Sequence, residues 1–76
     1  MNASAEEVMT IVKGVGVSAD ISGITPDMSL RKAGIDSIEM FTVLLAIEEK
    51  FAIKIPDADV EGLDTVNNIV RYLQSR

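Results

Sequence analysis

Residues 36–51, with the sequence DSIEMFTVLLAIEEKF, decide the fold. Asp36 is followed three residues later by Glu39, a capping-box pattern in which each side chain can accept a hydrogen bond from the backbone N–H of the other residue. The pattern predicts a helix from about Ser37 to Phe51. At about 100° per residue, one narrow sector of this helix gathers apolar side chains and is expected to face a core. The side chains in this sector are Met40, Val43, Leu44, Ile47 and Phe51.

A second apolar stripe lies on the flank of the same predicted helix. It consists of Ile38, Phe41 and Leu45; Ser37 lies between the two stripes at the helix start, and Glu48 and Glu49 border the far end. An apolar strip edged by carboxylates is typical of a docking surface. The alternative is a central helix whose neighbours cover both stripes. Mutation distinguishes the two: Leu45→Ala on an exposed flank should cost little stability, whereas truncation of a buried Ile47 should cost roughly 2–5 kcal/mol.

Helical periodicity predicts another helix near the start of the chain. Ser4 and Glu7 form a second capping box, followed by apolar residues at helical spacing. We therefore expect a helix over about residues 5–15. Gly14 and Gly16 supply its stop signals, because glycine tolerates the left-handed backbone conformation at a helix end.

Two more helices are predicted after residue 51. Pro56 prevents a helix through Ile55 and suits the first turn of a short helix over about residues 57–61, which Gly62 would close. Either Asp64 or Thr65 then caps a last helix, whose apolar residues recur at i, i+3, i+4 and i+7. These residues are Val66, Ile69, Val70 and Leu73.

The long segment 17–35 shows no sustained periodicity and is expected to be a loop that packs over the core, with a short helical turn near residues 28–32. We find no strand alternation and no internal repeat. The sequence therefore predicts an all-α fold: an antiparallel four-helix bundle of three main helices and one short helix, with a long first loop, as a single domain over residues 1–76.

Composition excludes several kinds of chemistry. The 76 residues include no Cys and no His, which removes disulfides, Cys/His zinc sites, thiol nucleophiles and histidine acid–base catalysis. No catalytic residue and no metal ligand is expected. The longest uncharged run in the predicted helices, residues 40–47, is far shorter than the roughly 20 apolar residues of a membrane span. The N-terminus lacks the pattern of a secretory signal, so we expect a cytoplasmic protein.

The net charge of −5 is concentrated in the middle of the chain. The segment from Asp36 to Asp64 has a net charge of −6, whereas the rest of the chain has +1. Such a surface repels phosphate backbones and anionic lipid, so neither nucleic acid nor membrane is an expected partner. A basic protein surface would be attracted.

Ser37 falls in the first turn of its predicted helix, where unpaired N–H groups and the helix dipole favour an attached phosphate. Plain helix capping is the simpler interpretation of an Asp-Ser step. Because the chain has no His or Cys, Ser37 has no evident general base. If it reacts, another protein must activate it.

Three pieces of the sequence together resemble the acyl carrier protein family over essentially the whole chain. They are Gly34-Ile35-Asp36-Ser37-Ile38, Ala46-Ile47-Glu48-Glu49-Lys50-Phe51 and Ile55-Pro56-Asp57. The resemblance implies a carrier and not an enzyme. It also implies that Ser37 bears a 4'-phosphopantetheine arm, transferred from coenzyme A by a magnesium-dependent phosphopantetheinyl transferase, whose thiol holds acyl groups as thioesters. The reactive sulfur would then belong to the cofactor, which accounts for a chain without Cys.

The resemblance also implies roles for the surrounding residues. Asp36 would help to position the metal of the transferase. The partner-facing side of the helix would consist of Ile38, Glu39, Phe41, Leu45, Glu48 and Glu49. The expected partners are the transferase and acyl-processing enzymes with basic docking faces, such as an acyltransferase or a ketosynthase, and the carrier itself is expected to be a monomer.

Some positions depart from the usual fatty-acid carrier. Ile38 stands where leucine is commonest, Thr42 occupies a position that is often acidic, and the basic pair Arg31-Lys32 precedes the serine motif. These departures favour a carrier for polyketide or other specialised biosynthesis over a carrier for fatty-acid synthesis. Met1 and the short ends lead us to expect a discrete, type II protein, although a domain from a larger synthase is an alternative.

Two other interpretations stay open. Residues 57–62 place oxygen ligands at positions 1, 3 and 5 and glycine at position 6, as at the start of an EF-hand calcium loop, but Asn68 stands where a bidentate glutamate belongs. An unmodified helical adaptor could also use the acidic flank to bind a basic partner.

Overall fold

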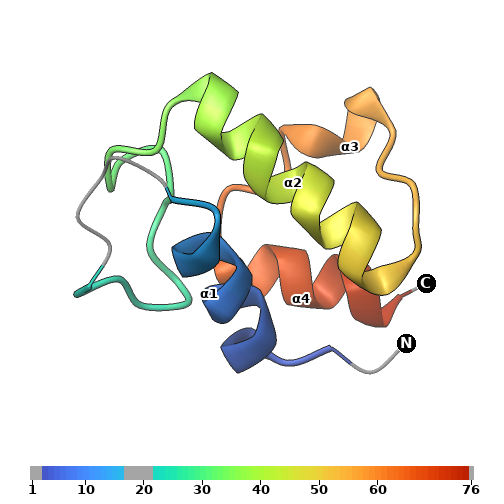
Figure 1. Ribbon diagram of the computed structural model, residues 1–76, viewed down its shortest axis with the longest axis horizontal. Helices are drawn as coiled ribbons and strands as arrows, with labels where there is room; N and C mark the ends of the chain where they lie inside the picture. Colours follow the sequence, from blue (N-terminus) through green and yellow to red (C-terminus); the bar gives the residue numbers. More distant parts are fainter. Residues whose placement is uncertain (1–2, 17–21, 76) are drawn as a thin grey trace.

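The computed structural model describes residues 3–16 and 22–75. The helices are α1 (Ala5–Gly14), α2 (Ser37–Phe51), α3 (Asp57–Val60) and α4 (Val66–Gln74), and the described part of the chain contains no strand (Figure 1). The all-α prediction of three main helices and one short helix is confirmed.

Helix α1 packs against both α2 and α4. In Figure 1, α2 and α4 run in the same sense across the view, and α1 runs back against them. The segment after residue 22 lies beside the N-terminal end of α2, at the left of the view, and leads into that helix. Ser37 therefore lies where this long connection joins the bundle.

The predicted caps fix where the main helices begin. In α2, the backbone N–H of Glu39 donates to Asp36 Oδ1 at 2.8 Å, and the Glu39 side chain closes the capping box. Ser4 and Glu7 form the corresponding box in α1. Of the two candidates for α4, Thr65 is the cap, because its Oγ1 accepts from the N–H of Asn68 at 3.0 Å.

The helix ends differ slightly from the prediction. Helix α1 ends at Gly14 and not at residue 15, with Gly16 in the left-handed region at φ 75°. Helix α3 ends at Val60, one residue early. Helix α2 ends at Phe51 as predicted, and Ala52, the residue after it, adopts a left-handed conformation without being glycine.

The helical turn predicted near residues 28–32 is present but lies slightly later in the chain, and it does not extend into a helix. The structure has hydrogen-bonded turns over residues 30–34 and no helix there. The N–H of Ala33 donates to the carbonyl of Ser29, whereas the N–H of Gly34 donates to that of Arg31, and Gly34 has φ 108°. The first hydrogen bond spans four residues, as in an α-helix, and the second spans three. The helical hydrogen-bond pattern therefore stops after one turn.

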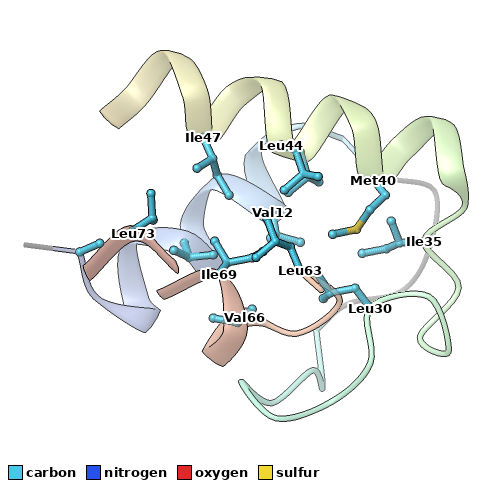
Figure 2. Close-up of a cluster of buried hydrophobic side chains, with 13 residues drawn as sticks. Val12, Leu30, Ile35, Met40, Leu44, Ile47, Leu63, Val66, Ile69 and Leu73 are labelled. Atoms are coloured by element: carbon cyan, nitrogen blue, oxygen red, sulfur yellow. The ribbon is translucent and has the colours of Figure 1, made fainter. Parts of the chain in front are cut away.

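The core forms between α1, α2, α4 and the two loops that follow α1 and α3 (Figure 2). Met40, Val43, Leu44 and Ile47 are buried as predicted, but Phe51 is only half-buried at the edge of the cluster. Figure 2 shows Leu30, Ile35 and Met40 at one end of the cluster, with Ile47 and Leu73 at the other. The remaining buried members are Ala3, Val8, Val12, Leu63, Val66 and Ile69.

Within residues 3–16 and 22–75, no helix is both long enough and apolar enough to cross a membrane.

Candidate functional site

Ser37 is the first residue of α2, and its side chain is exposed. Asp36, which precedes it, is also exposed and uses Oδ1 to cap the helix. The first-turn N–H groups and the positive end of the helix dipole favour a negatively charged group attached here. The hydroxyl is therefore accessible to an enzyme and suited to becoming a phosphoester.

A buried residue, Ile35, lies just before the exposed residues Asp36 and Ser37. Ile35 is buried in the core, and its backbone N–H donates to the carbonyl of Leu30, itself buried, at 3.1 Å. Ser37 thus emerges two residues after a fixed point of the core. The backbone that presents the hydroxyl is held on one side by the core and on the other by the Asp36 cap.

The flank predicted from spacing is exposed. The side chains of Ile38, Phe41 and Leu45, which we call the α2 stripe, are 79%, 58% and 43% exposed. Their neighbours on the core side, Val43 and Ile47, are fully buried. The alternative in which neighbouring helices cover both stripes is therefore wrong. An exposed row of three large apolar side chains beside Ser37 is suited to contact another protein.

The three glutamates predicted beside the stripe differ in what they contact. Glu49 is exposed. Glu48 is half-buried, and its Oε2 accepts from the N–H of Ile55 at 2.6 Å, which ties the loop after α2 to that helix. Glu39 is also half-buried, and its Oε1 accepts from the N–H of Asp36 at 3.4 Å. Glu48 and Glu39 therefore contribute to the fold, and Glu49 has the most accessible charge of the three.

A small pocket of about 30 Å³ lies beside the α2 stripe, between α2 and the segment that contains α3. Its lining includes Ile55, Asp57 and Val60, which the sequence did not assign to this face. The signal available in the sequence was Pro56, which starts α3 and so places Asp57 at its first position. The other lining residues are Phe41, Leu44, Leu45 and Glu48.

The calcium-loop interpretation of residues 57–62 does not fit the structure. Residues 57–60 form helix α3, whereas an EF-hand needs an extended ligand loop there. Among the residues that the structure describes, no group of three acidic, Cys or His side chains is placed to hold a metal ion.

Comparison with known proteins identifies the family of the chain. The phosphopantetheine attachment site family matches residues 6–73. The meromycolate extension acyl carrier protein of Mycobacterium tuberculosis (strain ATCC 25618 / H37Rv) is 37% identical over 73 residues, which cover 95% of this chain and 60% of the relative. The protein of the same name from Mycolicibacterium smegmatis is 36% identical and is covered over 70% of its length.

A shorter relative matches over nearly its whole length. The acyl carrier protein of Thermotoga maritima is 32% identical over 78 residues, which cover 97% of this chain and 96% of that protein. In contrast, this chain spans about 60% of the length of the Mycobacterium relatives. The family model and these identities show that the chain belongs to the acyl carrier protein family, whose members are carriers of a covalent 4'-phosphopantetheine group and not catalysts.

Proposed function

We propose that Ser37 is the attachment point of the 4'-phosphopantetheine arm and that the chain carries acyl intermediates as thioesters on it. The observation that carries the proposal is the exposed hydroxyl at the first turn of α2, directly after the Asp36 cap. The sequence offers no His or Cys to accept the serine proton. A separate phosphopantetheinyl transferase must therefore supply the base, with Asp36 proposed to help position its metal ion.

Thiol titration gives a direct test of this function. The chain has no Cys, so a thiol-specific reagent reads zero on the unmodified protein. Incubation with coenzyme A, magnesium and a broad-specificity transferase, followed by removal of small molecules, is expected to give one thiol per chain and a matching rise in intact mass. A reading that stays at zero, with no mass gain, would contradict the proposal.

We further propose that the acyl cargo belongs to polyketide or related specialised biosynthesis. The residues that support this are Ile38, Thr42 and the basic pair Arg31-Lys32, which depart from the pattern of the usual fatty-acid carrier. A second candidate is extension of fatty acyl chains, because relatives at 36–37% identity are named meromycolate extension acyl carrier proteins. Mass analysis of the acyl groups released from the native carrier separates the two. Chains that keep keto or hydroxy groups at several positions favour the first. Chains reduced everywhere beyond the carbon β to the thioester favour the second, because each round of fatty acyl extension itself passes through a 3-keto and a 3-hydroxy intermediate.

The α2 stripe and its acidic border are the proposed contact for partner enzymes. Ile38, Phe41 and Leu45 would give apolar contact, while Glu39, Glu48 and Glu49 would attract basic faces and speed encounter. The proposed partners are the transferase and acyl-processing enzymes such as an acyltransferase or a ketosynthase. We propose that the protein works in the cytoplasm as a monomer, with residues 1–76 as one domain.

Reversing one charge beside the stripe tests this docking. Glu49→Lys is expected to lower kcat/KM for transferase modification by about three- to tenfold at low salt, because electrostatic steering acts on association. The loss should shrink as salt rises, since added ions screen exposed charges. Glu6→Lys is the matched control, because Glu6 is also an exposed acid and lies on α1, outside the α2 stripe and its acidic border. Equal losses for the two variants would mean that net charge alone, and not this face, controls encounter.

A further inference from the structure

The carboxylate of Asp64, in the turn before α4, holds a segment that lies more than thirty residues earlier in the chain. Its Oδ2 accepts a hydrogen bond from the Ser29 hydroxyl. Its Oδ1 accepts from the backbone N–H of Arg31 at 3.1 Å and lies 4.0 Å from Arg31 Nε. One carboxylate therefore binds a hydroxyl, a backbone amide and a guanidinium of the same short segment.

The backbone beside Asp64 adds a further bond to this segment. The carbonyl of Asp64 accepts from the N–H of Leu30 at 2.7 Å. The Ser29 hydroxyl oxygen in turn accepts from the N–H of Lys32 at 3.2 Å, which closes the turn. We call residues 29–32, together with Asp64, the Asp64 clamp.

The Asp64 clamp connects directly to the presentation of Ser37. Leu30, which the clamp holds, accepts the backbone hydrogen bond of Ile35. Ile35 is followed by the Asp36 cap and then by the exposed Ser37 hydroxyl. The path from Asp64 to Ser37 thus runs through three successive fixed points: the turn at residues 29–32, the Leu30–Ile35 bond and the cap of α2.

Asp64 is not the N-cap of α4, although the sequence made it one of the two candidates. Thr65 caps α4, so the Asp64 carboxylate is available to bind Ser29 and Arg31 in the loop before α2. Hydrogen bonds to a charged acceptor are stronger than neutral ones, and this carboxylate is only partly exposed. Its loss would free the turn at residues 29–32 while α4 keeps its own cap.

We propose that Asp64 is a positioning residue for the modification of Ser37, because its carboxylate holds the preceding segment in the conformation that a phosphopantetheinyl transferase binds. The inference rests on the proposed function of Ser37. Asp64 takes no part in the transfer itself, whose reacting groups belong to Ser37, coenzyme A and the transferase. Without the clamp, only a fraction of the molecules would present the segment correctly, and the apparent affinity falls by that fraction.

The test is the steady-state modification of the full chain by a broad-specificity transferase with coenzyme A and magnesium. Asp64→Ala is expected to raise KM for the carrier about three- to tenfold while kcat changes less than about twofold. Asp64→Asn, which keeps an acceptor oxygen without the charge, is expected to recover part of that loss. Amide hydrogen exchange at Arg31, whose N–H loses its acceptor, should quicken in Asp64→Ala.

Thr65→Ala is the matched control, because it removes a hydrogen-bonding side chain at the next residue and weakens α4 without touching the clamp. It is expected to leave KM and the Arg31 exchange rate near their wild-type values. A KM for Asp64→Ala equal to that of the wild type or of Thr65→Ala would overturn the inference.

Two further outcomes have a defined meaning. If circular dichroism shows that Asp64→Ala does not fold, Ser29→Ala is used in its place, because this variant removes one hydrogen-bond donor to the Asp64 carboxylate. An unchanged KM for Ser29→Ala would then overturn the inference. Failure of the wild-type chain to accept any arm would contradict the proposed function, and the inference would fall with it. Modification of the wild type with no rise in KM for the variants would contradict the inference alone.

Discussion

Replacing Ser37 with alanine is expected to abolish attachment of the 4'-phosphopantetheine arm and, with it, all acyl loading. The fold should survive, because Ser37 is exposed and the cap of α2 comes from Asp36. Alanine is also a favourable residue in a helix. Intact mass and thiol content after incubation with transferase, coenzyme A and magnesium measure the loss, and circular dichroism measures the helix content.

Ser75→Ala is the control for this experiment, since Ser75 is an exposed serine at the far end of the chain, after α4. It is expected to gain the arm as the wild type does. A Ser37→Ala protein that still gains mass and a thiol would show that another hydroxyl carries the group. The unmodified adaptor hypothesis makes the opposite functional prediction, because an adaptor with Ser37→Ala should keep its activity.

The largest effect on stability is expected from Ile47→Ala. Ile47 is fully buried on the core side of α2, so that truncation removes apolar contacts and leaves a cavity. Large-to-alanine substitutions of this kind cost about 2–5 kcal/mol. Urea denaturation of the unmodified protein measures the loss, and a domain of this size has little stability to spare.

Leu45→Ala is the matched variant, two residues earlier on the same helix. The Leu45 side chain is 43% exposed, so the same type of truncation should cost under about 1 kcal/mol. The difference in unfolding free energy between Ile47→Ala and Leu45→Ala thus distinguishes the core side of α2 from the α2 stripe. Equal losses would mean that the stripe is covered in solution, which would contradict its proposed role in docking.

The sequence predicts the site best where the interactions are local. The Asp36–Glu39 capping box spans four residues, and it predicted the start of α2 and the place of Ser37 in its first turn. Helical spacing separated the buried side chains of α2 from the exposed stripe, because a 3.6-residue period assigns each side chain to a face. Only Phe51 departs, since it is partly buried and packs against the core from its edge.

Interactions between distant residues could not be predicted in this way. Periodicity could not decide between Asp64 and Thr65 as the cap of α4, because the choice depends on Ser29 and Arg31, which bind Asp64 across the fold. Likewise, Glu48 has the spacing of a surface residue, yet it binds the N–H of Ile55 after the chain has turned back.

Some backbone conformations also depend on tertiary context. Alanine has no preference for the left-handed region, so nothing in the local sequence predicts that Ala52, the residue after α2, adopts this conformation. The turn at residues 30–34 depends on the Asp64 clamp and on burial of Leu30, neither of which a local pattern contains. The fold and the serine were therefore predictable, whereas the segment that presents the serine was not.

Peptide mapping of the carrier purified from its native cell tests the central claim most directly. Trypsin cleavage after Lys32 and Lys50 releases peptide 33–50, in which Ser37 and Thr42 are the hydroxyl-bearing side chains. We predict that fragmentation of this peptide by mass spectrometry places a phosphopantetheine group on Ser37. A bare peptide 33–50 throughout the native population, or the group on Thr42 or in another peptide, would contradict the account.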